Sequence, residues 1–228
     1  MFRFRDDPVI ARAAPFLLFI GFLILSSALP ASVTMGGVAV SATWLVVARG
    51  AIIGLVLLWF WRGYGELRRP VGVRAVDWLL AIGGGCGVFV VWVGLDQDWA
   101  VLSRSDGYMP LNADGSVDRI QALARLAGFA LVVPLMEELF WRSLVLRWIE
   151  RHEFQSLAPR EVGWRAFAIT TVLFALEHDR WLAGAIAGAA YNWLYMRSGN
   201  LWVPILAHVV TNAALGIWVL QTHNWQFW

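Results

Sequence analysis

The chain has 228 residues, of which 59% are hydrophobic and 15% are charged, and its mean hydropathy is +0.62. A soluble domain of this length would carry roughly 25% charged residues and could not bury several long apolar runs. The net charge is only +2, and the basic residues, all arginine, lie in short segments between apolar runs, which excludes a nucleic-acid-binding surface. We therefore predict one all-α, membrane-embedded domain over residues 1–228.

The single cysteine, Cys86, lies inside an apolar, glycine-rich run. One cysteine excludes both a disulfide framework and a cysteine metal site. A lone cysteine in such a run is usually a small buried hydrophobic residue.

The N-terminal half predicts three membrane-spanning helices: Ala13 to Leu29, about Val38 to Trp61, and about Trp78 to Leu95. The first run could alternatively be a signal peptide, with Ser26-Ser27-Ala28 as a weak cleavage site. The remaining chain is membrane-embedded in either case.

The loops between these helices differ in charge. The first long loop carries four arginines, whereas five aspartates outnumber two arginines between Asp96 and Arg119. Because arginine is enriched in short cytoplasmic loops, we predict a cytoplasmic N-terminus and an external 96–119 loop. That loop either gates a site or connects two helices, and we expect a connector.

The C-terminal half predicts a long helix from Gln121 to Arg151 and three further spans. The fifth span runs from near Trp164 to His178, the sixth from Leu182 to Met196, and the seventh from Leu201 to about Leu220. The sixth span contains Gly184 and Gly188, and this spacing of small residues allows close packing of helices. This gives seven spans, with a motif-bearing core at 121–220.

Three charged residues lie where a solvent-facing residue is not expected, in the apolar middle of the long helix: Glu137, Glu138 and Arg142. Side chains four apart share a helix face, so Glu138 can pair with Arg142, whereas Glu137 points about 100° away. We expect Glu138 to be held and Glu137 to be free to act. The pair could equally be purely structural.

Two histidines are predicted at a depth similar to that of Glu137. His178 lies in the fifth predicted span and His208 in the last, where Asn212 follows on the same face. An ionisable group inside a membrane is costly and marks a functional site by default, although an intramembrane histidine can also be a hydrogen-bonding strut. Glu177 and Asp179 beside His178 indicate either a wet cavity or an early exit from the membrane.

These residues form three motifs: EELFWR is E-E-x-x-x-R, FALEH is F-x-x-x-H, and HVVTN is H-x-x-x-N. In this order the chain resembles the CAAX-protease and bacteriocin-processing family of intramembrane proteases, over roughly residues 122–220. The surrounding residues LVVPLMEELFWRS, LEHDRWLAG and NWQFW further resemble the bacterial subgroup associated with exosortase and PEP-CTERM sorting.

The resemblance implies an all-α bundle of about seven or eight transmembrane helices that hydrolyses a peptide bond. It implies that Glu137 is the general base for water, assisted by His178. His208 and Asn212 would bind the oxyanion, and Glu138 with Arg142 would hold the site together. It also implies a multi-pass protein of the bacterial cytoplasmic membrane.

Direct attack by water is favoured because no suitable nucleophile accompanies these residues. Cys86 is on another helix, and Ser143 faces no evident base. A zinc enzyme is the alternative, with Glu137, His178 and His208 as ligands, but the H-E-x-x-H spacing is missing. We expect no cofactor.

The expected partners are the lipid bilayer and a membrane-anchored peptide or protein substrate, together with a link to an exosortase sorting system. Two other functions stay open. The first is a non-proteolytic scaffold or immunity-type protein that keeps the motif residues as polar struts. The second is a proton-coupled transporter, although no inverted repeat is visible.

Overall fold

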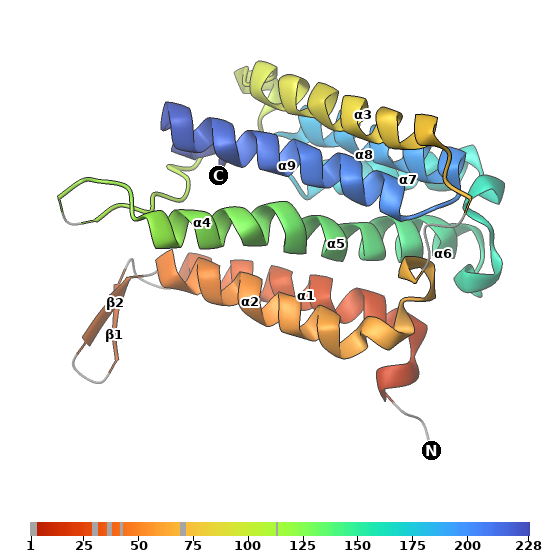
Figure 1. The fold of residues 1–228 in the computed structure, drawn as a ribbon, viewed down its shortest axis with the longest axis horizontal. Helices are drawn as coiled ribbons and strands as arrows, with labels where there is room; N and C mark the ends of the chain where they lie inside the picture. The colour runs from red at the N-terminus through yellow and green to blue at the C-terminus, as the bar shows by residue number, and fades with distance from the viewer. Residues whose placement is uncertain (1–3, 29–31, 36–37, 42, 69–71, 113) are drawn as a thin grey trace.

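The computed structural model describes all residues except 1–3, 29–31, 36–37, 42, 69–71 and 113. It confirms the predicted all-α class. The helices form a bundle in which one long central helix, α4 to α6, lies between two groups (Figure 1). Helices α1 (Pro8–Ala28) and α2 (Thr43–Phe60) pack on one side of it. The other side is covered by α3 (Ala75–Gly94), α7 (Trp164–Leu176), α8 (Trp181–Ser198) and α9 (Trp202–Thr222).

The central helix is not uniformly α-helical. It consists of α4 (Arg119–Ala127), α5 (Val133–Glu138) and α6 (Leu146–Glu150), joined by π-helical stretches at Gly128–Val132 and Leu139–Val145. The first stretch has a local cause. Pro134 has no N–H to donate to the carbonyl of Ala130, so the α-helical hydrogen-bond ladder cannot continue there.

The predicted start of the second span was wrong. Residues Val38–Ser41 form a strand, β2, that pairs antiparallel with β1 (Ser32–Met35), and α2 begins only at Thr43. The sequence SVTM-GG-VAVS places β-branched residues on both sides of Gly-Gly, which is a hairpin signal. The apolar character of the segment concealed this signal.

Four of the described helices are long and apolar enough to cross a membrane. They cover Pro8–Ser26, Trp44–Gly63, Ala75–Gly94 and Trp202–Thr222. Helix α7 is apolar but has 13 residues, and the central helix and α8 carry buried polar groups. The membrane location is thereby supported, whereas seven complete crossings stay a prediction.

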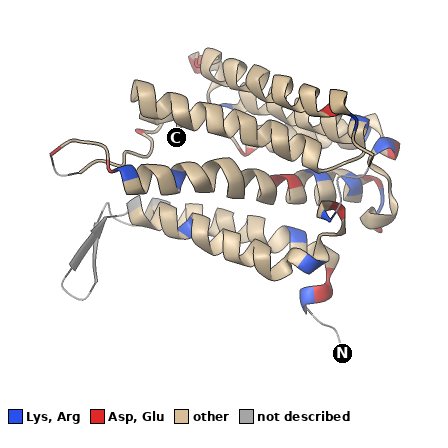
Figure 2. Cartoon of the chain, viewed as in Figure 1, with Lys and Arg blue, Asp and Glu red and all other residues tan. Residues whose placement is uncertain are grey.

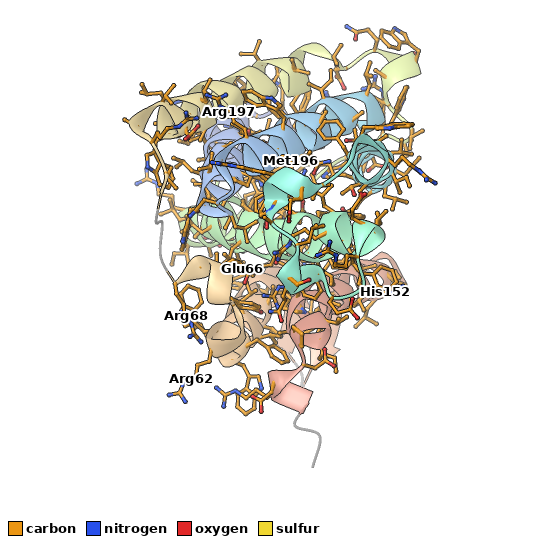
Figure 3. The ribbon with its side chains drawn as sticks, turned by 90° about the vertical axis from the view of Figure 1, so that its right-hand side faces the viewer. Arg62, Glu66, Arg68, His152, Met196 and Arg197 are labelled. Carbon is orange, nitrogen blue, oxygen red and sulfur yellow. The ribbon has the colours of Figure 1, made fainter. Side chains whose placement is uncertain are left out.

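The two ends of the bundle differ in charge. Most charged segments gather at the end that holds α6 and the N-terminus (Figure 2). Figure 3 faces this end, with Arg62 and Arg68 near the segment that leaves α2 and Arg197 near the end of α8. This is the end that the arginine bias predicts to be cytoplasmic.

At this end a buried polar cluster fixes α1 to the central helix. Arg12 is fully buried, donates to a Glu66 oxygen at 2.6 Å and donates to the Ser143 hydroxyl at 2.8 Å. Ser143 in turn donates to Glu66, and Arg147 donates to Ser143. Burial acts to raise the pKa of Glu66, but the charge and hydrogen bonds of Arg12, with the Ser143 bond, outweigh it and lower that pKa. The expectation that Ser143 faces no base was therefore wrong.

Glycines allow close approach of helices in this bundle, as Gly184, Gly188 and Gly85 illustrate. Gly184 and Gly188 lie against α7, where an added Cβ would be 3.2 Å from the His178 Cβ or the Phe174 ring, which confirms the predicted close packing. Gly85 on α3 faces α9 still more closely, because an added Cβ would lie 2.8 Å from the Cβ of Val210. There Thr211 also donates to the carbonyl of Gly85 at 2.9 Å.

We predict that Gly85→Ala will destabilise the protein by about 1 to 3 kcal/mol, because the methyl group must separate α3 from α9. Gly87→Ala is the matched control, since nothing lies within 4 Å of its added Cβ on the same helix. Alanine there should be neutral, or stabilising by up to about 1 kcal/mol through helix propensity. Thermal unfolding in detergent measures both, and equal behaviour of the two variants would contradict this packing.

Candidate functional site

A cavity in the bundle collects the residues singled out by the three motifs. Glu137, His178, His208 and Asn212 all line it, although they come from three separate parts of the chain. The cavity measures about 390 Å³ when the space that opens to solvent is included. Its remaining walls are Trp92, Phe129, Val133, Phe174, Ala187, Tyr191, Thr211 and Leu215. Few polar groups thus converge in a mostly apolar pocket, as is usual for ligand and active sites.

Glu138 lies at the centre of a buried charge network. One of its oxygens, Oε1, accepts a hydrogen bond from Arg142 at 3.1 Å and another from Nδ1 of His208 at 2.9 Å. The side chains of Glu138 and Arg142 are both completely buried. The predicted pair is present, and it extends to α9, because the same carboxylate also orients the histidine.

Arg142 connects the central helix to α8 as well. Its guanidinium donates to the carbonyl of Gly188 at 3.4 Å. The same group lies over the rings of Phe174 at 4.4 Å and Tyr191 at 5.3 Å. Such cation–π contacts compensate a desolvated charge. Arg142 is therefore held from two helices besides its own.

Glu137 has a different environment. Its residue surface is only 4% exposed, yet Oε2 has no hydrogen-bond partner among the described residues. The negative charge of nearby Glu177 acts on Glu137, while Glu177 itself accepts a 2.8 Å hydrogen bond from the Trp141 indole. A buried carboxylate oxygen without a partner is costly for folding, so it requires a functional or ligand-related explanation.

His178 lies just beyond the end of α7, which stops at Leu176. Its Nδ1 is 2.7 Å from the carbonyl of Phe174, and its ring packs against Trp92 and Phe174. A carbonyl only accepts, so Nδ1 carries the hydrogen and Nε2 of the neutral ring keeps the lone pair. Asp179 is exposed and binds Ser103, which agrees with an early exit of the chain from the membrane region.

Asn212 lines the cavity and also binds the central helix. Its amide nitrogen donates to the carbonyl of Phe129 at 2.9 Å. Phe129 belongs to the first π-helical stretch, where the regular ladder is interrupted and a carbonyl becomes available to a side chain. One amide hydrogen of Asn212 is thus occupied, and the second remains for a ligand.

Two polar wall residues were missed by the sequence analysis. Tyr191 stacks on His208 with 4.9 Å between ring centroids, and its hydroxyl donates to Thr211 at 2.7 Å. Thr211 stands inside the HVVTN motif, so its position one residue before Asn212 was an available signal. Tyr191 has no comparable signal, because an aromatic residue in an apolar helix is usually part of the core.

The proposed zinc ligands do not form a metal-binding group here. Within the described part of the chain, no three His, Cys, Asp or Glu side chains are arranged so that they could hold a metal ion. Both histidines do have Nδ1 bound to an acceptor, which is also the usual arrangement of metal-ligating histidines. As they are arranged among the described residues, Glu137, His178 and His208 do not fit a zinc site.

Comparison with known proteins gives a family match and a relative. Residues 119–214 match the family model described as type II CAAX prenyl endopeptidase Rce1-like. The Bacillus subtilis (strain 168) protein named "Putative membrane peptidase YdiL" is 27% identical over 114 residues, which cover 48% of this chain. Both matches support the resemblance of the chain to the CAAX-protease and bacteriocin-processing family. No solved structure matches the chain.

The family match covers all three motifs, from the start of α4 to Ala214 in α9. The matched segment spans 43% of the length of the Bacillus subtilis relative. The narrower resemblance to exosortase-associated members stays a prediction.

We predict opposite effects on stability at the two adjacent glutamates. Glu138→Gln leaves Arg142 buried without a counter-charge, so it should lower the free energy of unfolding by about 3 kcal/mol. Glu137→Gln replaces a desolvated, unpartnered carboxylate by a neutral amide and should leave stability unchanged or raise it. The variants are each other's control in chemical unfolding in detergent. Equal losses would show that the two carboxylates are held alike.

Proposed function

We propose that the protein is an intramembrane endopeptidase that hydrolyses a peptide bond of a membrane-anchored peptide or protein through activated water. The observation that carries this proposal is the carboxylate of Glu137, which lines the same cavity as His178, His208 and Asn212 and whose Oε2 has no hydrogen-bond partner among the described residues. The family match of residues 119–214 and the similarity to a named membrane peptidase support it.

In this mechanism Glu137 removes a proton from a water molecule, whose oxygen attacks the carbonyl carbon of the substrate peptide. Neutral His178 accepts a hydrogen bond from that water through Nε2 and orients it. The C–N bond then breaks, and Glu137 returns its proton to the leaving amine. The two products together contain the atoms of the cleaved peptide and of one added water molecule.

In the same mechanism, His208 and Asn212 stabilise the negative oxygen of the tetrahedral intermediate. His208 already donates from Nδ1 to Glu138, so a second donation from Nε2 requires the imidazolium form. Glu138 supplies the counter-charge for that form, and Arg142 holds Glu138. The free amide hydrogen of Asn212 is the second donor. Donors of this kind typically contribute about 3 to 4 kcal/mol to transition-state binding.

A covalent acyl-enzyme is disfavoured by the positions of the other nucleophiles. Ser143 is bound to Glu66, Arg12 and Arg147 in the separate cluster near α1. The hydroxyl of Thr211 lines the cavity but already binds the carbonyls of Gly85 and Ala207. Cys86 is exposed on the bundle rather than buried as expected, so its assignment as a buried hydrophobic residue was wrong.

The enzyme would act within the bacterial membrane. The substrate would enter the cavity from the bilayer, with the N-terminus of the protein in the cytoplasm of a bacterium. The protein would lie in the inner membrane and would be linked to an exosortase sorting system. This location and this link rest on the arginine bias of the loops and on the motif wording.

The decisive variant is Glu137→Gln, which keeps the shape of the side chain and removes the base. We expect cleavage of a membrane-anchored model substrate in detergent or vesicles to fall by about 10²- to 10⁴-fold. The control is Glu153→Gln, the same replacement at an exposed residue. If Glu137→Gln folds normally and cleaves at the wild-type rate, the scaffold alternative becomes the better description.

The metal question has a separate test. We expect purified protein to contain no stoichiometric zinc and to retain its cleavage rate after treatment with a chelator, because the site residues do not form a metal-binding group. Elemental analysis is combined with activity before and after chelation. Loss of activity that added zinc restores would establish the metal-dependent alternative.

A further inference from the structure

Arg49 is a buried cation without a counter-ion. It lies in the first two turns of α2, is 7% exposed, and makes no hydrogen bond or ion pair with any described residue. Within the described part of the chain, its guanidinium lies over the ring of Phe19, 4.6 Å from the ring centroid to the guanidinium carbon. Every aspartate and glutamate of the chain lies in the described part. No side chain of this protein therefore neutralises Arg49 by direct contact.

A second cation increases the positive charge of this region. Arg125 on α4 lies over the rings of Tyr108, Phe129 and Trp228, at 5.4 to 5.9 Å, and its buried Nε has no hydrogen-bond partner among the described residues. The charges of Arg49 and Arg125 act on each other. The two helices approach closely beside Arg49, because an added Cβ on Gly50 would lie 3.6 Å from the Cα of Gly128. The positive charges of Arg49 and Arg125 thus lie near each other, and a bound anion would reduce their repulsion.

Arg49 also forms one wall of a pocket between α1 and α2. The other walls are Phe22, Leu25, Ser26, Leu45 and Val46. The pocket measures about 310 Å³ with its open space included, and it is apolar apart from Arg49 and Ser26. The neighbouring surface is also apolar, with Leu25 54% exposed and Leu55 65% exposed. In a membrane this surface faces the acyl chains of lipids.

From this combination we infer that the pocket binds a phospholipid, with the phosphate on Arg49 and part of an acyl chain between α1 and α2. Arg49 lies about 9 Å along the helix axis from the start of α2, a depth that an arginine side chain can span to reach a lipid headgroup. Arginine binds phosphate oxygens in a bidentate manner. The phosphate would supply the counter-charge that the chain lacks. This site is separate from the cavity around Glu137.

The test uses the full-length protein, freed of lipid in detergent, and three probes. They are dioleoyl phosphatidylglycerol, dioleoylglycerol with the same chains but no phosphate, and inorganic phosphate. We expect only the phospholipid to raise the melting temperature, in a saturable manner, because it alone supplies both the anion and the chain. An equal rise with dioleoylglycerol would overturn the role of Arg49. An equal rise with inorganic phosphate would replace the lipid by a free anion.

Arg49→Met removes the charge and should weaken phosphatidylglycerol binding by at least about tenfold. Arg119→Met is the matched control, because Arg119 is an exposed arginine at the start of α4, and this variant should bind as wild type does. If Arg49→Met does not fold, Val46→Phe fills the pocket while it leaves the charge in place, and binding should again be lost. Wild-type binding by a folded variant at either position would refute the site.

Discussion

The structure depends on the buried carboxylate of Glu138, which one arginine and one histidine share. Charges removed from water must be compensated, so each partner of Glu138 is fixed by the need to stay in contact with it. Arg142 carries that constraint to α8 through the carbonyl of Gly188, and His208 carries it to α9. Three helices are therefore placed by a single carboxylate, and the cavity is the space that they enclose.

Buried charged groups in this chain have three kinds of environment. Glu138 and Glu66 of the Arg12 cluster each bind an arginine directly, and both serve the fold. Glu137 is buried with a free oxygen, which suits a group that must exchange a proton. Arg49 is buried without any counter-charge, which suits a group whose partner comes from outside the chain. The presence of an oppositely charged partner among the described residues, rather than burial alone, separates structural from functional charges here.

Much of this could be predicted because membrane-spanning helices and polar residues inside them leave strong signals in a sequence. The positions of α1, α3, α8 and α9 follow from apolar runs, and the gathering of Glu137, His178, His208 and Asn212 follows from depth and motif order. The pairing of β1 with β2 was not predicted, because the β-branched residues of these strands are also typical of a membrane-spanning segment. The bond from His208 to Glu138 could not be predicted, because helix periodicity describes neighbours on one helix and not contacts between helices.

The interrupted hydrogen-bond ladder of the central helix has a consequence for how this chain can vary in length. A π-helical turn holds one more residue than an α-helical turn, so it accommodates an insertion without rotating the residues beyond it. Removing one residue from Leu139–Val145 would either restore a regular helix there or turn the following segment by about 100°. In the second case Arg147 would turn away from Glu66 while the glutamates of the central helix kept their places. The spacing between the two charge clusters is therefore a fixed register, and alignments with other members should keep it free of gaps.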